Sequence, residues 1–431
     1  MKVAAFLPAK GTSERIPSKN QKLLDGKPLF LHTLEKLVEM DCIDQVYLDS
    51  ESDEILNYAD YLPYQKLKRD PALANNKTDG HQMFYNEVKQ VDADIYLQIL
   101  GTSPFIQPST IQKGIQVLKE CPEYDSVVLV KREKQYCWEA GQPAYDKNHI
   151  PNSVDLPDTV IETMGLYMVR KQTALAQHKR IGEHPYLLEA EPIEAIDVNF
   201  PADFALAELI AKGLRAKRMQ YLRTLKGSFN SSIFSDILDE YGLRTVIQGL
   251  SCPIPGTKIF GYANTLKIRK LQEGEDYRGI YRALESYGKM RMGDIILVEN
   301  EVPDRAYFGE LNANLAVRAG AEGTIVGGVT RDMQEVKKLG YPVFSAGYCC
   351  GDVKRVATVE QMGCPIQIRG ITICPGDLIF GDENGIVVIP HRLEKEVLDK
   401  AVQTVAKEKD ILGKIIQQED AQSIYQTAGE F

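Results

Sequence analysis

The chain has 431 residues, a length that favours two or three domains. Its 51 Lys and Arg against 60 Asp and Glu give a formal net charge of −9, which argues against a protein built mainly to hold nucleic acid. This charge still allows a local basic pocket for a nucleotide. A hydrophobic content of 44% with 26% charged residues is typical of a globular chain that buries a sizeable core.

Cysteine usage and hydropathy indicate the compartment. The eight Cys include no CxxC pair, so we expect reduced thiols and no structural zinc. The apolar run Val3–Pro8 is interrupted at Lys10 and is interpreted as a first strand, not a signal peptide. No stretch approaches the roughly 18 apolar residues of a membrane helix. We therefore expect a cytoplasmic protein with no membrane partner.

The first half of the chain alternates strand-like and helix-like segments. This alternation predicts a mostly parallel sheet covered by helices, with ligands bound at the carboxyl ends of the strands. The expected strands are Lys2–Pro8, Gln45–Leu48, Ile95–Leu100, Ser126–Val130 and Gly165–Val169, and the expected helices are Leu29–Met40, Thr110–Leu118 and Ala202–Ala211.

The pattern changes near residue 215. The stretch Ala211–Gly227 carries six Lys and Arg residues without a Pro or Ser cluster, which predicts a helical connector with a solvated basic face. An anion-binding role for these cations is the alternative. The second half then shows a helix at Ile233–Glu240, a closing helix over about residues 394–411, and short strands between them. These strands are Lys258–Gly261, Ile295–Val298, Gly323–Val326, Pro342–Phe344, Ile366–Ile368 and Gly385–Ile389. We expect a first domain over residues 1–215, a connector over 216–228 and a second α/β domain over 229–431.

The loop after the first strand concentrates positive charge. Lys10, Arg15, Lys19 and Lys22 stand beside Gly, Thr and Ser, and such a loop offers cations and backbone N–H groups to a polyphosphate. The P-loop and dinucleotide fingerprints are both absent. From the residues alone, a phosphate site and a solvated basic loop remain equally open.

The exact string of this loop decides between them. Pro8–Lys22 followed by Gly26–Leu29 resembles the opening signature of the CMP-sugar-acid synthetases, which include the N-acylneuraminate and 3-deoxy-octulosonate cytidylyltransferases. Three further segments resemble motifs of this family in the same order: Arg69–Ala74, Leu97–Pro104 and Ile196–Phe204. The resemblance covers about residues 1–215 and implies a Rossmann-like nucleotidyltransferase fold.

The resemblance also implies a reaction and its residues. An oxygen of a small acidic acceptor attacks the α-phosphorus of CTP, pyrophosphate leaves, and Mg²⁺ assists. It implies catalytic roles for Lys10, Arg15 and Lys22 and a metal-binding role for Asp197. The substrate-binding residues that it implies are Ala9, Gly11, Ser13, Lys19, Asn20, Arg69, His81, Gln98, Thr102 and Ser103.

Departures from the family pattern concern the metal and the acceptor. Asn199 stands where the family has a second aspartate, and Asp203 either compensates or caps the following helix. His81 either touches the acceptor or the pyrimidine, or is structural. A sialic acid or another 3-deoxy-2-ulosonic acid is the expected acceptor. A phosphonate is the alternative, because phosphonate cytidylyltransferases carry a similar opening.

The second half holds an acidic and basic constellation. Twenty residues separate Glu310 from Arg331, which is followed by Asp332. Carboxylates suit a hard divalent cation, and an arginine binds a carboxylate or enolate through two hydrogen bonds. From spacing alone, a surface salt bridge between Arg331 and Asp332 is the alternative.

This region resembles the family shared by the 4-hydroxy-4-methyl-2-oxoglutarate aldolases and the RraA-like regulators of ribonuclease activity. The resemblance rests on the GEL segment at Gly309–Leu311, the Arg331–Asp332 pair and flanking Gly-rich motifs over about residues 222–411. It implies a swivelling β/β/α domain that binds pyruvate or a related 2-keto acid, with a second Mg²⁺. In that case Asp332 ligates the metal, Glu310 holds a metal-bound water, and Arg331 stabilises the enolate. The backbone of Gly309, Leu311 and Asn312 binds the carboxylate. Gly327–Gly328 departs from the family pattern.

Together the two resemblances predict a bifunctional enzyme. A pyruvate aldolase can make 2-keto-3-deoxy acids, and cytidylyltransferases of the first family activate such acids. The alternative is that the second domain is a non-catalytic oligomerisation or protein-binding module. Both families imply a homo-oligomer, as a dimer, trimer or hexamer.

Overall fold

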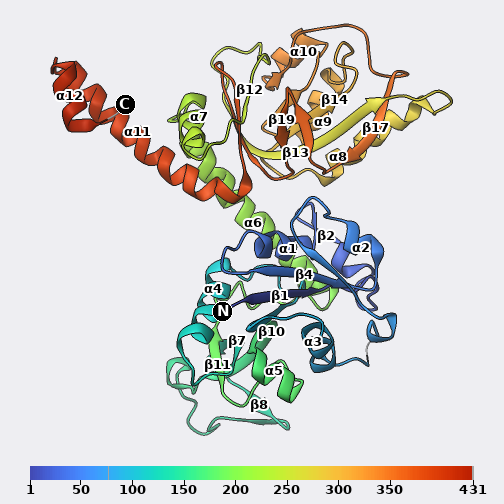
Figure 1. Ribbon diagram of the computed structural model, residues 1–431, viewed down its shortest axis with the longest axis vertical. Helices are drawn as coiled ribbons and strands as arrows, with labels where there is room; N and C mark the ends of the chain where they lie inside the picture. The colour runs from blue at the N-terminus through green and yellow to red at the C-terminus, as the bar shows by residue number, and fades with distance from the viewer. Residues whose placement is uncertain (76, 430–431) are drawn as a thin grey trace. The chain divides into compact units, whose positions relative to one another are not determined.

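The computed structural model describes residues 1–75 and 77–429. The chain forms two compact units, Met1–Ala211 and Lys212–Phe431 (Figure 1). No helix in the described part of the chain has the length and apolar character needed to cross a bilayer.

The first unit is built on a seven-stranded sheet with the order β11-β7-β10-β6-β1-β4-β5. The strands are β1 Val3–Pro8, β4 Gln45–Ser50, β5 Gln65–Lys68, β6 Ile95–Ile99, β7 Ser126–Glu133, β10 Thr159–Arg170 and β11 Pro185–Glu189. Strand β10 runs antiparallel to both of its neighbours, and the other pairs are parallel. The mostly parallel sheet expected from the βα alternation is confirmed.

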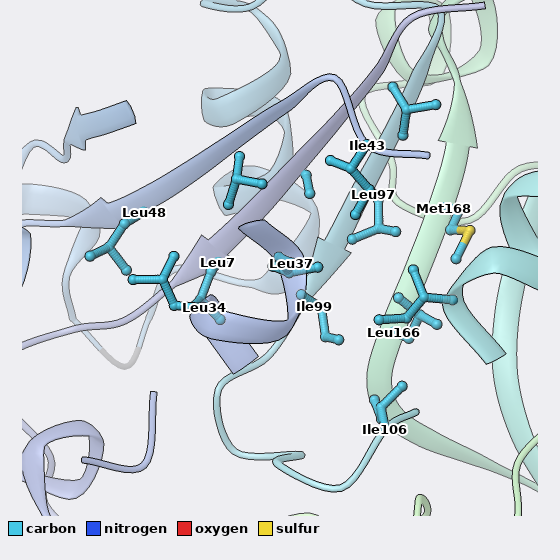
Figure 2. Close-up of a cluster of buried hydrophobic side chains, with 14 of the residues drawn as sticks. Leu7, Leu34, Leu37, Ile43, Leu48, Leu97, Ile99, Ile106, Leu166 and Met168 are labelled. Atoms are coloured by element: carbon cyan, nitrogen blue, oxygen red, sulfur yellow. The ribbon is translucent and has the colours of Figure 1, made fainter. Parts of the chain in front are cut away.

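Helices cover both faces of this sheet. The central strand β1 sends Val3, Ala5 and Leu7 to one face and Ala4 and Phe6 to the other, as the two-residue period of a strand requires. The first face packs against α1 Leu31–Val38, α2 Asp53–Asn57 and α4 Pro108–Glu120, as Figure 2 shows for part of this core. The second face packs against α3 Gly80–Val88 and α5 Lys171–Gln177.

The second unit has a mixed eight-stranded sheet with the order β12-β21-β20-β13-β14-β15-β16, and β17 also pairs with β13. The strands are β12 Val246–Ile247, β13 Ile259–Lys270, β14 Asp294–Asn300, β15 Gly323–Val326, β16 Val343–Phe344, β17 Ala357–Met362, β20 Leu378–Gly381 and β21 Ile386–Ile389. Strands β13 to β16 pair in parallel and the others antiparallel. Its helices are α7 Ser231–Glu240, α8 Leu284–Lys289, α9 Glu310–Ala319, α10 Met333–Lys338, α11 Glu394–Ile416 and α12 Ala421–Ala428. This unit is α/β, as expected.

Three short two-stranded ladders complete the strands. They are β2 Leu23–Leu24 with β3 Lys27–Pro28, β8 Trp138–Glu139 with β9 Gln142–Pro143, and β18 Ile366–Ile368 with β19 Ile371–Ile373. The first ladder lies directly after the basic loop in the chain and leads into α1.

One helix, α6 Pro201–Lys226, covers both the expected helix at 202–211 and most of the expected connector. Lys212, Lys217 and Arg223 are exposed, as the predicted solvated basic face requires, whereas Arg215, Arg218 and Lys226 are half-buried. Arg215 lies 2.5 Å from the buried Asp294, Arg223 lies 2.6 Å from Glu322, and Arg218 pairs with Glu394. These arginines therefore have partners within the second unit and are not an anion site.

Candidate active site

The first unit contains a cavity of about 700 Å³ at the carboxyl ends of β1, β5 and β6. Parallel strands end at the same edge of a sheet, and loops leaving that edge are where α/β folds bind ligands. The cavity is lined by Pro8, Lys10, Ser13, Glu14, Arg15, Lys19, Asn20, Arg69, Leu73, Asn75, Thr78, Met83, Leu100, Gly101, Thr102, Met164, Asp197 and Asn199. We call it the main cavity.

Hydrogen bonds fix the basic loop along the edge of the sheet. The N–H of Ala9 donates to the Asp49 carbonyl at 2.8 Å, and the N–H of Gly11 donates to Glu51 Oε1 at 2.7 Å. The buried Asn20 side chain donates through Nδ2 to the Lys10 carbonyl at 2.8 Å. Asn20 therefore holds the loop in shape while also lining the cavity.

Three cations of the loop line the main cavity, namely Lys10, Arg15 and Lys19. Lys19 Nζ donates to the Val198 carbonyl at 2.9 Å. Burial lowers the pKa of the Lys19 ammonium to about 8, Arg15 and Lys10 push in the same direction, and Asp197 opposes them. Positive charge concentrated in a partly desolvated cavity suits a polyphosphate.

Arg69 lines the cavity from a buried position. Its guanidinium donates to both carboxylate oxygens of Asp49, with Nη2 at 2.7 Å from Oδ2. Beside this pair, burial and the charge of Asp49 raise the pKa of Glu87 well above its usual range. The neutral acid form of Glu87 is favoured, so Asp49 can pair with Arg69 without a second buried anion beside it.

Asp197 brings a carboxylate to the same cavity. Its Oδ2 accepts a hydrogen bond from Asn199 Nδ2, while its Oδ1 is buried and receives no hydrogen bond from any described residue. Asp203 is occupied elsewhere, since its Oδ2 accepts from the N–H groups of Asn199 and Phe200 at 3.0 and 2.7 Å at the start of α6. Asp203 therefore caps the helix, as one of the two alternatives had it.

The structure brings together eight of the predicted residues of the first domain. These are Lys10, Ser13, Arg15, Lys19, Asn20, Arg69, Thr102 and Asp197. The other six predicted residues do not line the cavity: Ala9, Gly11, Lys22, His81, Gln98 and Ser103.

Three of these six have clear structural partners. Lys22 Nζ lies 4.3 Å from the centre of the Phe204 ring, a cation–π contact. His81 Nδ1 accepts from the Arg180 N–H at 3.2 Å, and Gln98 donates to the Glu87 carboxyl group at 2.6 Å inside β6. Gln98 belongs to the motif Leu97–Pro104, and the residues of that motif that line the main cavity are Leu100, Gly101 and Thr102.

Sequence reasoning missed a group of lining residues in the segment after Arg69. Leu73, Asn75, Thr78 and Met83 belong to it. Asn75 Oδ1 accepts from the Thr78 N–H at 3.1 Å, two residues before α3 begins at Gly80. The signal was present, because this segment follows directly on one of the recognised motifs, Arg69–Ala74.

Three of the predicted residues of the second unit, namely Gly309, Glu310 and Arg331, lie against Asp332. The N–H of Glu310 donates to Asp332 Oδ2 at 3.2 Å, and a Cβ on Gly309 would overlap that oxygen, so only glycine allows this approach. Arg331 Nη1 lies 2.7 Å from Asp352 Oδ2 and its Nε lies 3.5 Å from Asp332 Oδ2. The surface salt bridge and the anion-site interpretations of Arg331 are therefore both compatible with this geometry.

A cavity of about 340 Å³ adjoins this pair, lined by Arg331, Asp332, Met333, Tyr348, Cys349 and Cys350. Gly309, Glu310, Leu311 and Asn312 do not line it. Leu311 is 78% exposed, and Asn312 Nδ2 donates to the Tyr307 carbonyl at 2.9 Å. The structure thus places Arg331 and Asp332 at a cavity and Gly309 and Glu310 against Asp332, whereas Leu311 and Asn312 contact neither the cavity nor Asp332 in any hydrogen bond that the structure shows.

The two sites differ in how well they fit a divalent metal. Within residues 1–75 and 77–429, no three His, Cys, Asp or Glu side chains gather as a metal cage. Mg²⁺ commonly takes one or two carboxylates plus substrate phosphates, so Asp197 with its unpartnered oxygen fits a metal that arrives with a nucleotide. At the second site the cavity offers the single carboxylate of Asp332, and the residues fit a metal less well.

A mostly parallel sheet, a basic loop after its first strand and a carboxylate in the same cavity define a nucleotidyltransferase. The chain belongs to the cytidylyltransferase family, whose sequence model matches residues 4–219. A second match, to the Aldolase/RraA family, covers residues 231–388. The two predicted family resemblances are confirmed.

Individual relatives match one half of the chain each. CMP-N,N'-diacetyllegionaminic acid synthase of Legionella pneumophila is 25% identical over 221 residues, which are 48% of this chain and 95% of that protein. A Halalkalibacterium halodurans protein provisionally named 4-hydroxy-4-methyl-2-oxoglutarate aldolase is 29% identical over 172 residues, 40% of this chain and 77% of that protein. Protein DlpA of Legionella pneumophila is 34% identical over 175 residues, which are 40% of this chain but 28% of DlpA.

Among solved structures, a CMP:2-keto-3-deoxy-manno-octonic acid synthetase complexed with CTP aligns with a TM-score of 0.39 at 18% identity, covering 49% of this chain and all of that chain.

Proposed function

We propose that the first unit transfers a cytidylyl group from CTP to a small acidic acceptor and releases pyrophosphate. An oxygen of the acceptor forms a bond to the α-phosphorus, the bond from that phosphorus to the β-phosphate oxygen breaks, and pyrophosphate leaves with the electron pair. The observation that carries the proposal is the convergence of Lys10, Arg15 and Lys19 with Asp197 in the main cavity.

In this proposal the residues of the cavity position and neutralise the triphosphate. Lys10, Arg15 and Lys19 hold its oxygens, where negative charge builds as pyrophosphate departs. The buried salt bridge to Asp49 fixes Arg69 rigidly, so that Arg69 presents a preorganised wall to the nucleotide. Asp197 would hold a Mg²⁺ ion that arrives with the nucleotide, and the ion would supply charge neutralisation and orientation.

A 3-deoxy-2-ulosonic acid of the sialic-acid type is the proposed acceptor. The relative of Legionella pneumophila is named as a CMP-N,N'-diacetyllegionaminic acid synthase and matches 95% of its own length, which supports an acid sugar. Asn199 in place of a second carboxylate leaves a site with less negative charge around the metal and acceptor.

We propose that the chain divides into two functional domains, residues 1–215 and residues 229–431. For the second of them we propose a lyase activity on a 2-keto acid. Arg331 would bind the carboxylate or the enolate oxygen. The pairing of its Nη1 with Asp352 holds the guanidinium at the wall of the cavity. Asp332 and Glu310 remain the candidate residues for Mg²⁺.

The first test is pyrophosphate release by the full chain from CTP and Mg²⁺ with a panel of acceptors. The panel holds sialic acid, other 3-deoxy-2-ulosonic acids, and aminoethyl- and hydroxyethylphosphonate. We expect release with a keto-sugar acid and none with UTP in place of CTP. Release with phosphonates alone would overturn the sugar-acid acceptor, and no release with any acceptor would overturn cytidylyl transfer to an acid.

A further inference from the structure

A buried carboxyl group of the first unit is joined to the main cavity by other buried polar side chains. Glu87 on α3 is the carboxyl group, and the side chains are those of Gln98 on β6, Asp49 on β4, Arg69 and Arg180. Of these five residues, Arg69 is the one that lines the main cavity. We call the five residues the polar chain. Sequence reasoning singled out Gln98 and Arg69 but none of the other three.

The orientation of the Gln98 amide follows from its two neighbours in the polar chain. Arg180 Nη1 donates to Gln98 Oε1 at 3.4 Å. A guanidinium can only donate, so the amide oxygen must face Arg180. The amide nitrogen therefore faces Glu87 and donates to its Oε2 at 2.6 Å. In this contact Oε2 of Glu87 is the acceptor.

The same reasoning locates the acid proton of Glu87. Its Oε2 accepts from Gln98, whereas its Oε1 is buried and receives no hydrogen bond from any described residue. The Asp49 carboxylate lies within hydrogen-bonding reach of the Glu87 carboxyl group. Two carboxylates accept hydrogen bonds and cannot donate one without a proton. The proton of Glu87 therefore belongs on Oε1, between the two acids.

The surroundings of Glu87 favour its neutral form. Burial, the negative charge of Asp49 and the hydrogen bond between the two acids raise the pKa of Glu87 well above its usual 4.5. The Gln98 amide and the Arg69 charge oppose this shift but do not reverse it. Arg180 reaches Glu87 only through the Gln98 amide. Glu87 is therefore a hydrogen-bond donor to Asp49.

Asp49 links this hydrogen bond to the nucleotide site. Its carboxylate accepts from Arg69 Nε and Nη2, and its carbonyl oxygen accepts from Arg69 Nη2 at 3.0 Å. Each carboxylate oxygen has two lone pairs, so Asp49 can accept from Glu87 and Arg69 at the same time. Without the donor on Glu87, the Asp49 carboxylate has one contact fewer to fix its orientation. The guanidinium of Arg69 is then held less firmly at the cavity wall.

We propose that Glu87 positions Arg69 for CTP by donating a hydrogen bond from its Oε1 to the Asp49 carboxylate. Glu87 is a positioning residue, because it acts on the nucleotide through Asp49 and Arg69. The inference rests on the proposed binding of CTP in the main cavity. It also gives the buried Gln98 a role, which is to orient the acid so that its proton faces Asp49.

The first test is the Kd of the full chain for CTP with Mg²⁺, measured by isothermal titration calorimetry without an acceptor. In Glu87→Gln the amide oxygen can replace Oε2 and the amide nitrogen can replace the protonated Oε1, so the Kd should stay at the wild-type value. Glu87→Leu has no donor, and its Kd should rise about tenfold, as expected for the loss of a buried hydrogen bond. Phe84→Leu is the matched control, because it alters a buried side chain of α3 outside the polar chain. It should leave the Kd unchanged.

A double variant shows whether Glu87 acts through Arg69. Arg69→Gln removes the guanidinium that Asp49 holds, so adding Glu87→Leu in that background should raise the Kd no further. The same tenfold rise in both backgrounds would indicate a general loosening of the site and would overturn the positioning role.

The location of the proton has a readout that does not depend on CTP. An acid whose pKa is raised in the folded chain loses stability as the pH rises from its unfolded pKa through its folded pKa, whereas glutamine has no proton to lose. The Tm of Glu87→Gln should therefore gain on that of wild type between about pH 5 and about pH 8. A difference in Tm that stays constant or shrinks over this range would mean that Glu87 is ionised, and it would overturn the proposal.

Two failures can be told apart in the calorimetry. If wild type binds CTP and Glu87→Leu binds it equally well, the role of Glu87 is overturned while the proposed function stands. If wild type does not bind CTP with Mg²⁺, the proposed function is overturned, and the role of Glu87 with it.

Discussion

Lys19 and Lys22 lie three residues apart in the same basic loop but have different surroundings. Lys19 lines the main cavity, whereas Lys22 lies over the Phe204 ring. We expect Lys19→Met to lower kcat/KM for CTP by roughly 10²- to 10³-fold, because a fixed charge in a partly desolvated site is lost. Lys22→Met should cost less than about tenfold, the size expected for an exposed cation–π contact. Pyrophosphate release at varied CTP measures both.

An equal loss in the two variants would contradict this distinction. It would restore the catalytic role that the sequence resemblance implies for Lys22. Circular dichroism of both variants is the control for folding.

The lowered pKa of Lys19 predicts a pH dependence. Its pKa of about 8 means that the ammonium is present below this pH and is lost above it. Since kcat/KM reports the free enzyme, its value for CTP should fall as the pH rises through about 8. Lys19→Arg stays charged and should remove this alkaline limb.

Lys36 is the internal check on that experiment. It is half-buried, its Nζ donates to the Pro104 and Ile106 carbonyls at 2.6 and 2.7 Å, and desolvation lowers its pKa to about 8 as well. An alkaline limb that persists in Lys19→Arg and disappears in Lys36→Met would assign the limb to Lys36. In that case, deprotonation of Lys36 would weaken its hydrogen bonds to the Pro104 and Ile106 carbonyls. CTP binding would be lost because the adjoining turn with Thr102, which lines the main cavity, changes.

Gln98 illustrates that the sequence does not show which residues of a recognised motif face the cavity. The motif Leu97–Pro104 is recognisable, but which of its members face the cavity depends on where β6 ends. The strand ends at Ile99, so Gln98 stays in the sheet and Leu100 to Thr102 turn toward the cavity. Long-range hydrogen bonds such as that from the Gly11 N–H to Glu51 Oε1 join residues forty positions apart and have no local signal in the sequence.

At the scale of elements, the start of α6 is stabilised by Asp203, whose role as a helix cap or as a metal ligand the sequence did not decide. Asp203 stands in its first turn and accepts from the N–H groups of Asn199 and Phe200. We expect Asp203→Ala to lower the stability of the start of α6 by about 1 kcal/mol, the usual size for the loss of a cap. Native-state hydrogen exchange over residues 199–210 measures it, with Asp203→Asn expected to retain part of the protection.

A different result would return Asp203 to the metal. If Asp203→Ala leaves hydrogen exchange unchanged but raises the Mg²⁺ concentration needed for half-maximal activity, the carboxylate acts on the cation and not on the helix.

Strand lengths were harder to predict than strand positions. The expected strand at Gly165–Val169 is the buried end of β10, which extends back to Thr159 through residues that alternate between exposed and half-buried. The expected strand at Lys258–Gly261 is the start of β13, which continues to Lys270. Hydrophobic runs mark only the part of a strand that is buried on both faces, so polar extensions and the edge strand β5, with one buried residue, escape detection.

At the scale of the whole molecule, the order of the motifs predicted more than any single element. Four motifs in the order of one family and one cluster in the pattern of another identify both halves, and both family matches agree with them. The order of the motifs did not predict which residues of a metal site come together in the structure. Sequence places Glu310, Arg331 and Asp332 in one pattern, whereas the cavity of the second unit is lined by only two of them.

The chain should carry two separable activities. Every residue that lines the main cavity lies within residues 8–199, and every residue that lines the cavity of the second unit lies within residues 331–350. A side chain removed from one site leaves the composition of the other unchanged. We therefore expect Lys19→Met to lower kcat/KM for CTP by the roughly 10²- to 10³-fold given above and to leave the lyase rate on a 2-keto acid at the wild-type value. Asp332→Asn should do the reverse, with a loss of lyase rate of about 10²-fold or more.

Both activities are measured on the full chain, with Mg²⁺ present and then chelated. Loss of both activities in either variant would show that the two sites depend on each other. A lyase rate that survives Asp332→Asn and chelation would exclude Asp332 and the metal from that chemistry. A wild-type chain that releases pyrophosphate but shows no lyase activity would favour the second unit as a binding or oligomerisation module. The cavity of that unit has Arg331 paired with Asp352 and the single carboxylate of Asp332. Such a site would then bind an anion without converting it.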